Sequence, residues 1–83
     1  MAHLRFTRRA LRDIRKLSPE VQRRIEIALD ALIEDPQAGD PLHGDWKGYW
    51  KLRAGDYRII YRITDTNGVE IQYVRHRREA YRP

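Results

Sequence analysis

The first half of the chain has the hydrophobic spacing of two amphipathic helices that follow a short strand. Alternation over residues 3–6 predicts the strand, and Thr7 is placed to cap the helix that follows. Ser18 and Pro19 form a second helix start, because Ser is a favoured N-cap and Pro fits the first helical position. Pro36 ends that helix, because proline disfavours helical geometry in the residue before it. The apolar helical faces hold Ala10, Leu11, Ile14 and Leu17 in the first helix and Val21, Ile25, Leu29, Leu32 and Ile33 in the second.

The second half of the chain changes to a period of two, which indicates strands. Glycine and proline first break residues 36–48 into a loop. The expected elements after it are a strand at 49–53, a turn at 54–56, a strand at 57–64, an Asn-Gly hairpin turn at 65–68 and a strand at 69–75. We therefore predict one α+β domain spanning residues 1–83. It has the order β-α-α-β-β-β, with a two-helix hairpin on one face of a small twisted antiparallel sheet.

Strand alternation divides the longest predicted strand into an apolar and a cationic face. The predicted helices need an apolar partner surface, so the apolar set should pack against them. The other set should then stand on a face exposed to solvent. The first set is Tyr57, Ile59, Tyr61 and Ile63, and the second is Arg58, Ile60 and Arg62.

Several conspicuous side chains are better explained by structure than by chemistry. By strand period, Tyr73 belongs to the core, and at least one of Trp46 and Trp50 should close an end of the core rather than stack on a nucleobase. Alternation points His76 away from the residue that follows it, so we expect it to pack or hydrogen-bond. Asp56 is typical of a turn former.

The composition excludes several classes of protein. The chain contains no Cys and three scattered His, so disulfide frameworks and thiolate metal sites are excluded and a histidine metal site is disfavoured. No apolar run is long enough to span a membrane, and the N-terminus lacks the apolar core of a signal peptide. We expect a cytoplasmic protein that uses no metal or other cofactor and does not bind a membrane.

Charge is distributed in three blocks along the chain. Residues 1–24 hold eight Lys/Arg and two Asp/Glu, residues 25–45 hold no Lys/Arg and six Asp/Glu, and residues 46–83 hold nine and four. The blocks therefore carry +6, −6 and +5, which sum to the net charge of +5. Such a basic domain favours nucleic acid or an acidic protein as its partner, although charge runs also occur on faces that are only solvated.

The cationic strand face and the C-terminal segment together suit phosphate. Residues 74–83 are short, basic and aromatic, and they should pass the open face near Lys51 and Arg58. Arg offers a planar fork and Lys a point charge to a phosphate group. Without a metal, such residues can also assist attack of a 2′-OH on the adjacent phosphate. The residue types alone leave binding and cleavage both open.

Four segments together resemble the RelE/ParE toxin superfamily over nearly the whole chain. In this chain, FTRRALRDIRKL resembles the family's opening strand and first helix. SPEVQRRIEIALDALIEDP resembles the family's second helix. KLRAGDYRIIYRI resembles the family's central strand pair. HRREAYR resembles the family's C-terminal His-Arg, which is followed four residues later by Tyr. The ordered set is more specific than any one of its segments.

The resemblance implies a toxin of a bacterial or archaeal toxin–antitoxin pair. RelE-type members cleave mRNA in the ribosomal A site, and ParE-type members poison DNA gyrase. The presence of Arg77 and Tyr81 favours a RelE-type, metal-independent endoribonuclease. A ParE-type gyrase inhibitor and a non-catalytic nucleic-acid-binding domain stay open as alternatives.

The resemblance also implies roles for single residues. Lys51 matches a lysine that contacts the scissile phosphate, and Arg58 matches an arginine that holds phosphate in the transition state. Arg77 matches an arginine that contacts phosphate or donates a proton. Tyr81 matches a tyrosine that stacks on a base and acts as general base. Further expected RNA contacts are Lys47, Arg53, Arg62, Arg75, Arg78 and Arg82.

This chain departs from the family pattern at one position. The resemblance also implies binding partners. Some RelE-type enzymes have a second lysine two residues before the first, where this chain has Tyr49; Lys47 or Arg53 is a candidate substitute. The implied partners are the ribosome with its mRNA and a cognate antitoxin protein, in a toxin–antitoxin hetero-oligomer.

Overall fold

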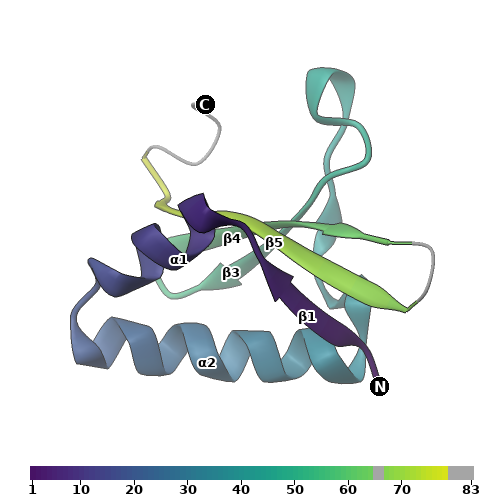
Figure 1. Ribbon diagram of the computed structural model, residues 1–83. Coiled ribbons are helices and arrows are strands. Elements are labelled where there is room, and N and C mark those ends of the chain that lie inside the picture. Colours follow the sequence, from purple (N-terminus) through teal and green to yellow (C-terminus); the bar gives the residue numbers. More distant parts are fainter. Residues whose placement is uncertain (65–66, 79–83) are drawn as a thin grey trace.

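The backbone follows the predicted order of elements, with additions in the loop (Figure 1). This computed structural model describes residues 1–64 and 67–78. Its helices and strands are β1 (His3–Phe6), α1 (Arg8–Arg15), α2 (Pro19–Glu34), η1 (Pro36–Ala38), β2 (Asp40–Pro41), η2 (Gly44–Trp46), β3 (Trp50–Ala54), β4 (Tyr57–Ile63) and β5 (Gly68–His76). Among these residues, no helix is both long and apolar enough to cross a membrane.

Both helices begin at the predicted caps. Thr7 Oγ1 accepts a hydrogen bond from the N–H of Ala10 at 3.0 Å, and Ser18 Oγ accepts one from the N–H of Val21 at 3.3 Å. Each bond satisfies a donor that the first helical turn would otherwise leave without a partner. The second helix ends as predicted, because Asp35 already has extended backbone angles of φ −149° and ψ 100°.

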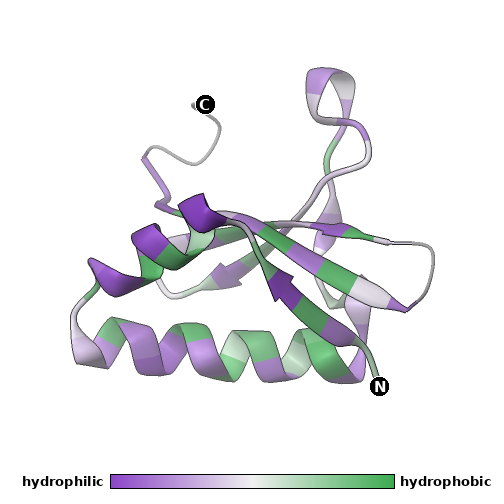
Figure 2. Ribbon diagram, in the orientation of Figure 1, coloured by the Kyte–Doolittle hydropathy of each residue, from purple (hydrophilic) through white to green (hydrophobic). Residues whose placement is uncertain are grey.

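The helical hairpin covers one face of the sheet, as predicted. α1 packs against β5 and α2 packs against β3. Figure 2 shows α1 as largely hydrophilic, which fits a helix that buries a narrow apolar stripe. The buried core between helices and sheet includes Ala10, Ile25, Ala28, Leu32, Ile59, Tyr61, Val69, Ile71 and Val74.

The sheet is mixed rather than wholly antiparallel. Its strand order is β1-β5-β4-β3-β2, and β1 pairs parallel to β5 with His3 opposite Gly68 and Phe6 opposite Ile71. The remaining pairs are antiparallel. The expectation of a uniformly antiparallel sheet was wrong for β1. After the helical hairpin, β3 runs in the same direction as β1. The chain then reverses twice, into β4 and into β5, so β5 also runs parallel to β1.

The segment expected to be only a loop contributes the edge strand β2. Asp40 pairs with Lys51 and Pro41 pairs with Trp50. β2 stops there, so the backbone of residues 52–54 in β3 faces no further strand within the described part of the chain. A proline is tolerated in β2 because edge strands do not need every N–H in a ladder.

A β-bulge lies in the middle of β5. Ile60 pairs with Tyr73, whereas its neighbour Tyr61 pairs with Ile71, so Gln72 is the extra residue on β5. A bulge of this kind shifts the alternation of every side chain that follows it. Before Gln72, the odd-numbered residues of β5 face the helices, and after it the even-numbered residues do.

Tyr61 ties the loop to the core through its hydroxyl group. The ring is fully buried and stacks on Trp50 with centroids 6.1 Å apart. The hydroxyl donates to the carbonyl of Pro36 at 2.7 Å and accepts from the N–H of Gly39 at 3.1 Å. A Cβ at Gly39 would lie 2.2 Å from the carbonyl oxygen of Lys51, so only glycine fits this close approach. Trp50 closes an end of the core, as expected for at least one tryptophan.

Replacing Tyr61 with Phe should lower the free energy of unfolding by about 1–3 kcal/mol. The ring would keep its packing, but the carbonyl of Pro36 and the N–H of Gly39 would each lose a buried partner. Urea unfolding at neutral pH, followed by circular dichroism, measures the change. Tyr57→Phe is the matched control, because that ring is only partly buried. Equal stabilities of the two variants would contradict this account.

The same residue should make the fold sensitive to alkaline pH. Burial raises the pKa of Tyr61 from 10.0 to about 12, opposed by the hydrogen bond from Gly39 and assisted by the charges of Asp35 and Asp40. The folded state therefore holds the hydroxyl proton more tightly than the unfolded state. Its contribution is complete below pH 10 and is lost as pH rises toward 12. Tyr61→Phe should remove that part of the alkaline loss of stability.

Candidate functional site

Three arginines stand side by side on the face of the sheet that the helices leave open. Arg58 of β4 pairs with Arg53 of β3 and with Arg75 of β5. Their strand neighbours Ile59 and Val74 belong to the helix-facing core, so alternation turns the arginines to the opposite face. We call Arg53, Arg58 and Arg75 the arginine row. Directly opposed residues have Cβ atoms about 4.5–5.5 Å apart, where like charges destabilise a sheet.

Arg75 at the end of the arginine row has an unsatisfied donor. Its Nε is buried and makes no hydrogen bond within residues 1–64 and 67–78. A buried donor without a partner typically costs about 1–3 kcal/mol. This donor lies at the end of a row that holds two more guanidinium groups, so an anionic group is the favoured partner for it.

A second row on the same face carries Lys51. Lys51 pairs with Ile60, and Ile60 pairs with Tyr73. Ile60 is wholly buried and Tyr73 is 4% exposed, although neither belongs to the core under the helices. We call Lys51, Ile60 and Tyr73 the lysine row. It places an ammonium group, an apolar floor and an aromatic ring beside the arginine row.

The expectation that Tyr73 is a buried core residue is confirmed, but Tyr73 is not buried under the helices. Counting in twos from Val69 and Ile71 would place it there, but Gln72 is the bulged residue and shifts the frame by one. Tyr73 is buried all the same, on the opposite face. Trp46 meets its ring edge-on at a centroid distance of 6.2 Å, and the guanidinium carbon of Arg9 lies 4.2 Å from the ring centroid.

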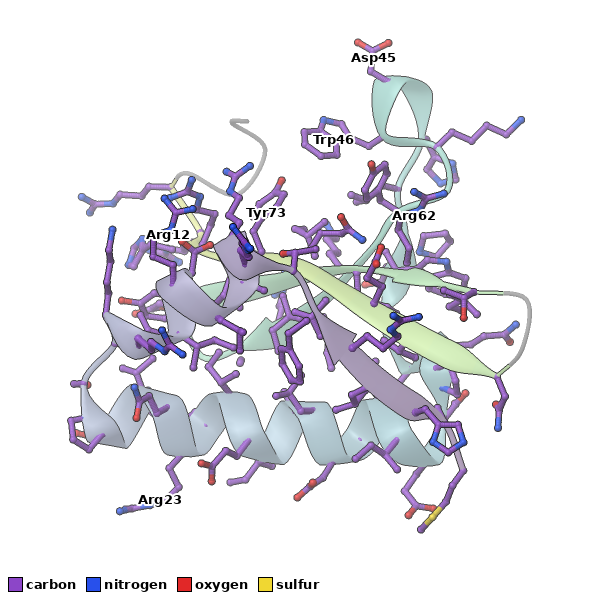
Figure 3. The ribbon with its side chains drawn as sticks, in the orientation of Figure 1. Arg12, Arg23, Asp45, Trp46, Arg62 and Tyr73 are labelled. Atoms are coloured by element: carbon purple, nitrogen blue, oxygen red, sulfur yellow. The ribbon has the colours of Figure 1, made fainter. Side chains whose placement is uncertain are left out.

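Arg62 lies apart from the arginine row. Alternation puts it on the same face as Arg58, but the rise of a strand separates the two by about 13 Å along β4. Its partner across the strands is Glu70, and its guanidinium carbon lies 5.3 Å from the ring centroid of Tyr49. Figure 3 shows Arg62, Trp46 and Tyr73 on the same side of the sheet, while Arg23 of α2 projects from the other side.

The start of the C-terminal segment is held at the arginine end of the sheet. The N–H of Arg77 donates to the carbonyl of Asp56 at 2.7 Å, and Asp56 lies in the tight turn between β3 and β4. The side chains of Arg77 and Arg78 are exposed there. The predicted site residues Tyr81 and Arg82 lie outside the residues that the structure describes.

The remaining predicted positions lie in the loop after η2, at the end of β5 and in the turn between β3 and β4. Lys47 follows η2 directly and is exposed. His76 has the expected packing role, with its ring edge-on to Tyr57 at a centroid distance of 5.3 Å. Its Nδ1 accepts a hydrogen bond from the N–H of Arg78 at 3.4 Å. Asp56 is a turn residue, as expected.

Sequence reasoning missed Arg9. The helical pattern shows only that Arg9 is polar and lies beside the buried Ala10. Its position over Tyr73 depends on how α1 packs against β5, which local periodicity cannot show. The sequence left two roles open for Trp46, closing the core or stacking on a base. Trp46 lies at the open face rather than in the core.

The two rows can bind a phosphodiester and stabilise added negative charge on it. They bring together Lys51, Arg53, Arg58 and Arg75, and neither row as the structure describes it contains a carboxylate. Preorganised cations contribute most where charge develops in a transition state. Residues 1–64 and 67–78 contain no group of three or more His, Cys, Asp or Glu side chains that could hold a metal ion.

The family of the chain follows from comparison with known proteins. A family model described as the ParE toxin of the type II toxin–antitoxin system parDE matches residues 4–81. The chain belongs to the RelE/ParE toxin superfamily. It is a toxin of the type II toxin–antitoxin class.

Relatives of the toxin carry RelE-type names. The chain is 39% identical over 82 residues to Toxin RelG of Mycobacterium tuberculosis, covering 95% of this chain and 94% of the relative. It is 34% identical over 83 residues to Toxin RelE of the same organism, covering 96% and 86%. The crystal structure of the toxin–antitoxin complex RelBE2 from Mycobacterium tuberculosis matches with a TM-score of 0.83 and 37% identity, covering 90% of this chain and 96% of that one. The RelE-like α+β fold is thus confirmed.

Arg58→Gln should stabilise the toxin while weakening its affinity for phosphate. The change removes the central charge of the arginine row and relieves repulsion of about 0.2–1 kcal/mol per neighbouring pair. Thermal unfolding should shift upward without added anion. Inorganic phosphate should then raise the midpoint less than in the parent, because a ligand stabilises only the state that binds it.

Arg23→Gln on α2 is the matched control, because it removes an exposed charge on the other side of the molecule (Figure 3). It should leave both the midpoint and the response to phosphate unchanged. An Arg58→Gln variant that is less stable than the parent in low salt would contradict the assigned repulsion.

Proposed function

We propose that the toxin is a ribosome-dependent endoribonuclease that cleaves mRNA in the A site and so inhibits translation in the cytoplasm. The observation that best supports this is the pairing of the arginine row with the lysine row on one open face. A phosphodiester laid across Arg58 would meet Lys51 from the neighbouring row. The identities to toxins named RelG and RelE favour the same activity.

The proposed reaction is attack of the 2′-OH on the adjacent phosphate, without a metal cofactor. Lys51 contacts the scissile phosphate, and Arg58 holds it as negative charge grows in the transition state. Arg77 contacts phosphate or donates the proton to the leaving 5′-oxygen. Tyr81 stacks on a base and acts as general base.

The other basic residues would hold the RNA strand on both sides of the scissile bond. Arg53 and Arg75 extend the phosphate site across the arginine row. Arg62 lies too far along β4 to share that phosphate, so it would contact a different nucleotide. The remaining contacts would come from Lys47 and Arg78, which are exposed, and from Arg82.

Inhibition of DNA gyrase is the alternative function, because the matching family model bears the ParE name. A gyrase poison needs no catalytic groups, so the two functions separate experimentally. After induction of the toxin, translation, plasmid supercoiling and mRNA ends would be followed together. New mRNA ends with unchanged supercoiling support the proposed function, and the reverse result supports gyrase inhibition. Binding to nucleic acid without either effect would identify a non-catalytic domain.

Removing Arg75 or Arg77 should slow cleavage strongly. Arg75 stands in the arginine row, and Arg77 follows the end of β5. Comparing Arg75→Ala with Arg77→Ala therefore tests which of the two arginines contributes more to cleavage. Loss of one preorganised donor typically lowers the rate about a hundredfold to a thousandfold. Cleavage on programmed ribosomes measures both variants. We expect a loss of that size from Arg77→Ala, and a comparable or larger loss from Arg75→Ala.

Tyr81→Phe tests proton transfer separately from stacking. It keeps the ring and removes the hydroxyl, so cleavage should fall while ribosome binding stays, whereas Tyr81→Ala should reduce both. Thermal unfolding is the control for folding in every variant. If Arg77→Ala and Tyr81→Phe cleave at the parent rate while folded, the assignment of these catalytic residues is wrong.

The partner that we propose is a small antitoxin that is acidic where it touches the toxin. The similar structure from Mycobacterium tuberculosis is that of a toxin–antitoxin complex, RelBE2. On this chain, an apolar groove of about 310 Å³ lies between α2 and β3, with Ile27 66% exposed and Leu52 in its wall. Arg24 and Arg53 line the same groove. Beside it, the edge of β3 beyond Lys51 can accept an added strand.

Ile27→Asp should weaken the antitoxin complex by tenfold or more, roughly the effect of removing one interface hot spot. The change removes apolar contact and adds a negative charge facing an acidic partner. Titration calorimetry with the antitoxin encoded nearby measures it, and cleavage on ribosomes should stay near the parent rate. Leu11→Asp is the matched control, because Leu11 is also an exposed apolar residue but lies on α1. Equal weakening by both variants would contradict this docking surface.

A further inference from the structure

A hollow lined by aromatic rings lies beside the two cationic rows. It has a volume of about 350 Å³, and its walls come from the start of α1, the loop around η2 and the bulge of β5. The lining residues are Thr7, Arg9, Trp46, Tyr49, Gln72 and Tyr73. We call it the aromatic pocket. The roles proposed above leave this pocket without a function.

The rings of the aromatic pocket are arranged edge to face. Trp46 meets Tyr49 at a centroid distance of 5.6 Å and an angle of 80°, and meets Tyr73 at 6.2 Å and 61°. Rings inclined in this way do not stack on one another. Arg62 lies over the ring of Tyr49, with its guanidinium carbon 5.3 Å from the ring centroid. Arg9 adds a guanidinium group 4.2 Å from the centroid of Tyr73, and guanidinium planes stack on nucleobases as well.

The volume and chemistry of the pocket fit a single nucleobase. Small-ligand sites typically measure about 300–1,000 Å³, so this pocket is at the lower end of that range. Three of its six lining residues are aromatic, and the other three are Thr7, Arg9 and Gln72. Thr7 is already committed, because its hydroxyl donates to the carbonyl of Gln72 at 2.6 Å and accepts from the N–H of Ala10. Recognition would therefore come mainly from stacking, which tolerates different bases.

The pocket lies one nucleotide's reach from the phosphate site. Tyr73 belongs both to the pocket and to the lysine row, so pocket and row share a wall. On β5, Tyr73 and Arg75 are two residues apart on the same face, a separation of about 6.6 Å. A base in the pocket would thus leave its own backbone phosphate near Arg75 and Arg58.

We infer that the aromatic pocket is a nucleobase-binding site that seats one unstacked base of the RNA while the two rows hold the adjacent phosphate. This inference rests on the proposed binding of RNA to the open face. It adds a positioning role for Trp46, whose ring fixes where along the strand the scissile phosphate meets Lys51 and Arg58. Base–aromatic stacking accounts for the affinity, and the surrounding cations orient the backbone.

The two tryptophans of the chain allow a direct test with the full-length toxin. Trp50→Phe leaves Trp46 as the only indole, since Trp50 is stacked on Tyr61 away from the pocket. The probe is a short 2′-O-methyl oligoadenylate, which has purine rings for stacking but no free 2′-OH for cleavage. An abasic oligomer of the same length supplies the phosphates alone. Oligoadenylate should quench the fluorescence of Trp46, and the abasic oligomer should not.

A second variant tests the affinity. Trp46→Leu should bind oligoadenylate about tenfold to a hundredfold more weakly, the usual effect of losing one base–aromatic stack, and should bind the abasic oligomer as the parent does. Trp50→Phe should bind both probes like the parent. Equal binding of oligoadenylate by the parent and by Trp46→Leu would overturn the inference.

The outcomes separate this inference from the proposed function. A toxin that binds oligoadenylate through Trp46 but leaves mRNA intact on ribosomes would support the pocket and contradict the endoribonuclease. A toxin that cleaves mRNA, but whose Trp46→Leu variant binds oligoadenylate like the parent, would overturn the pocket and leave the endoribonuclease standing.

Discussion

Packing of the helical hairpin against a single face of the sheet is the constraint on which the rest of this toxin depends. Ile25 and Leu32 of α2 and Ile59 of β4 are buried in that layer, and hydrophobic burial is the dominant favourable term in folding. Because side chains alternate along a strand, each residue committed to the layer sends its neighbour to the other face. The position of Arg58 is therefore a consequence of where Ile59 must be.

The open face is arranged at the expense of stability. A protein selected only for folding would not place three guanidinium groups across adjacent strands. Nor would it bury the Nε of Arg75 without a hydrogen-bond partner among the residues that the structure describes. The core compensates with a fully buried layer and with the hydroxyl of Tyr61, which fixes the loop after α2. Strain of this kind is typical of surfaces that are completed by a ligand.

Local signals in the sequence predicted most of the fold. The caps at Thr7 and Ser18 and the two faces of β4 are set by near neighbours, so they could be derived from the chain alone. The parallel pairing of β1 and the additional strand β2 depend on contacts between distant segments and were not foreseen. The same holds for the site. Alternation along β4 predicted the face on which Arg58 lies, whereas Arg9 reaches the open face only through tertiary packing.

The single extra residue in β5 sets the length tolerance of the C-terminal half. Ahead of Gln72, odd-numbered positions such as Ile71 face the helices; beyond it, even-numbered positions such as Val74 do. Deleting Gln72 would remove the bulge and restore regular alternation, because Tyr73 would then follow Ile71 directly. Val74 would still face the helices and Arg75 the open face. The bulge is therefore a place where this strand can lose one residue without exchanging its two faces.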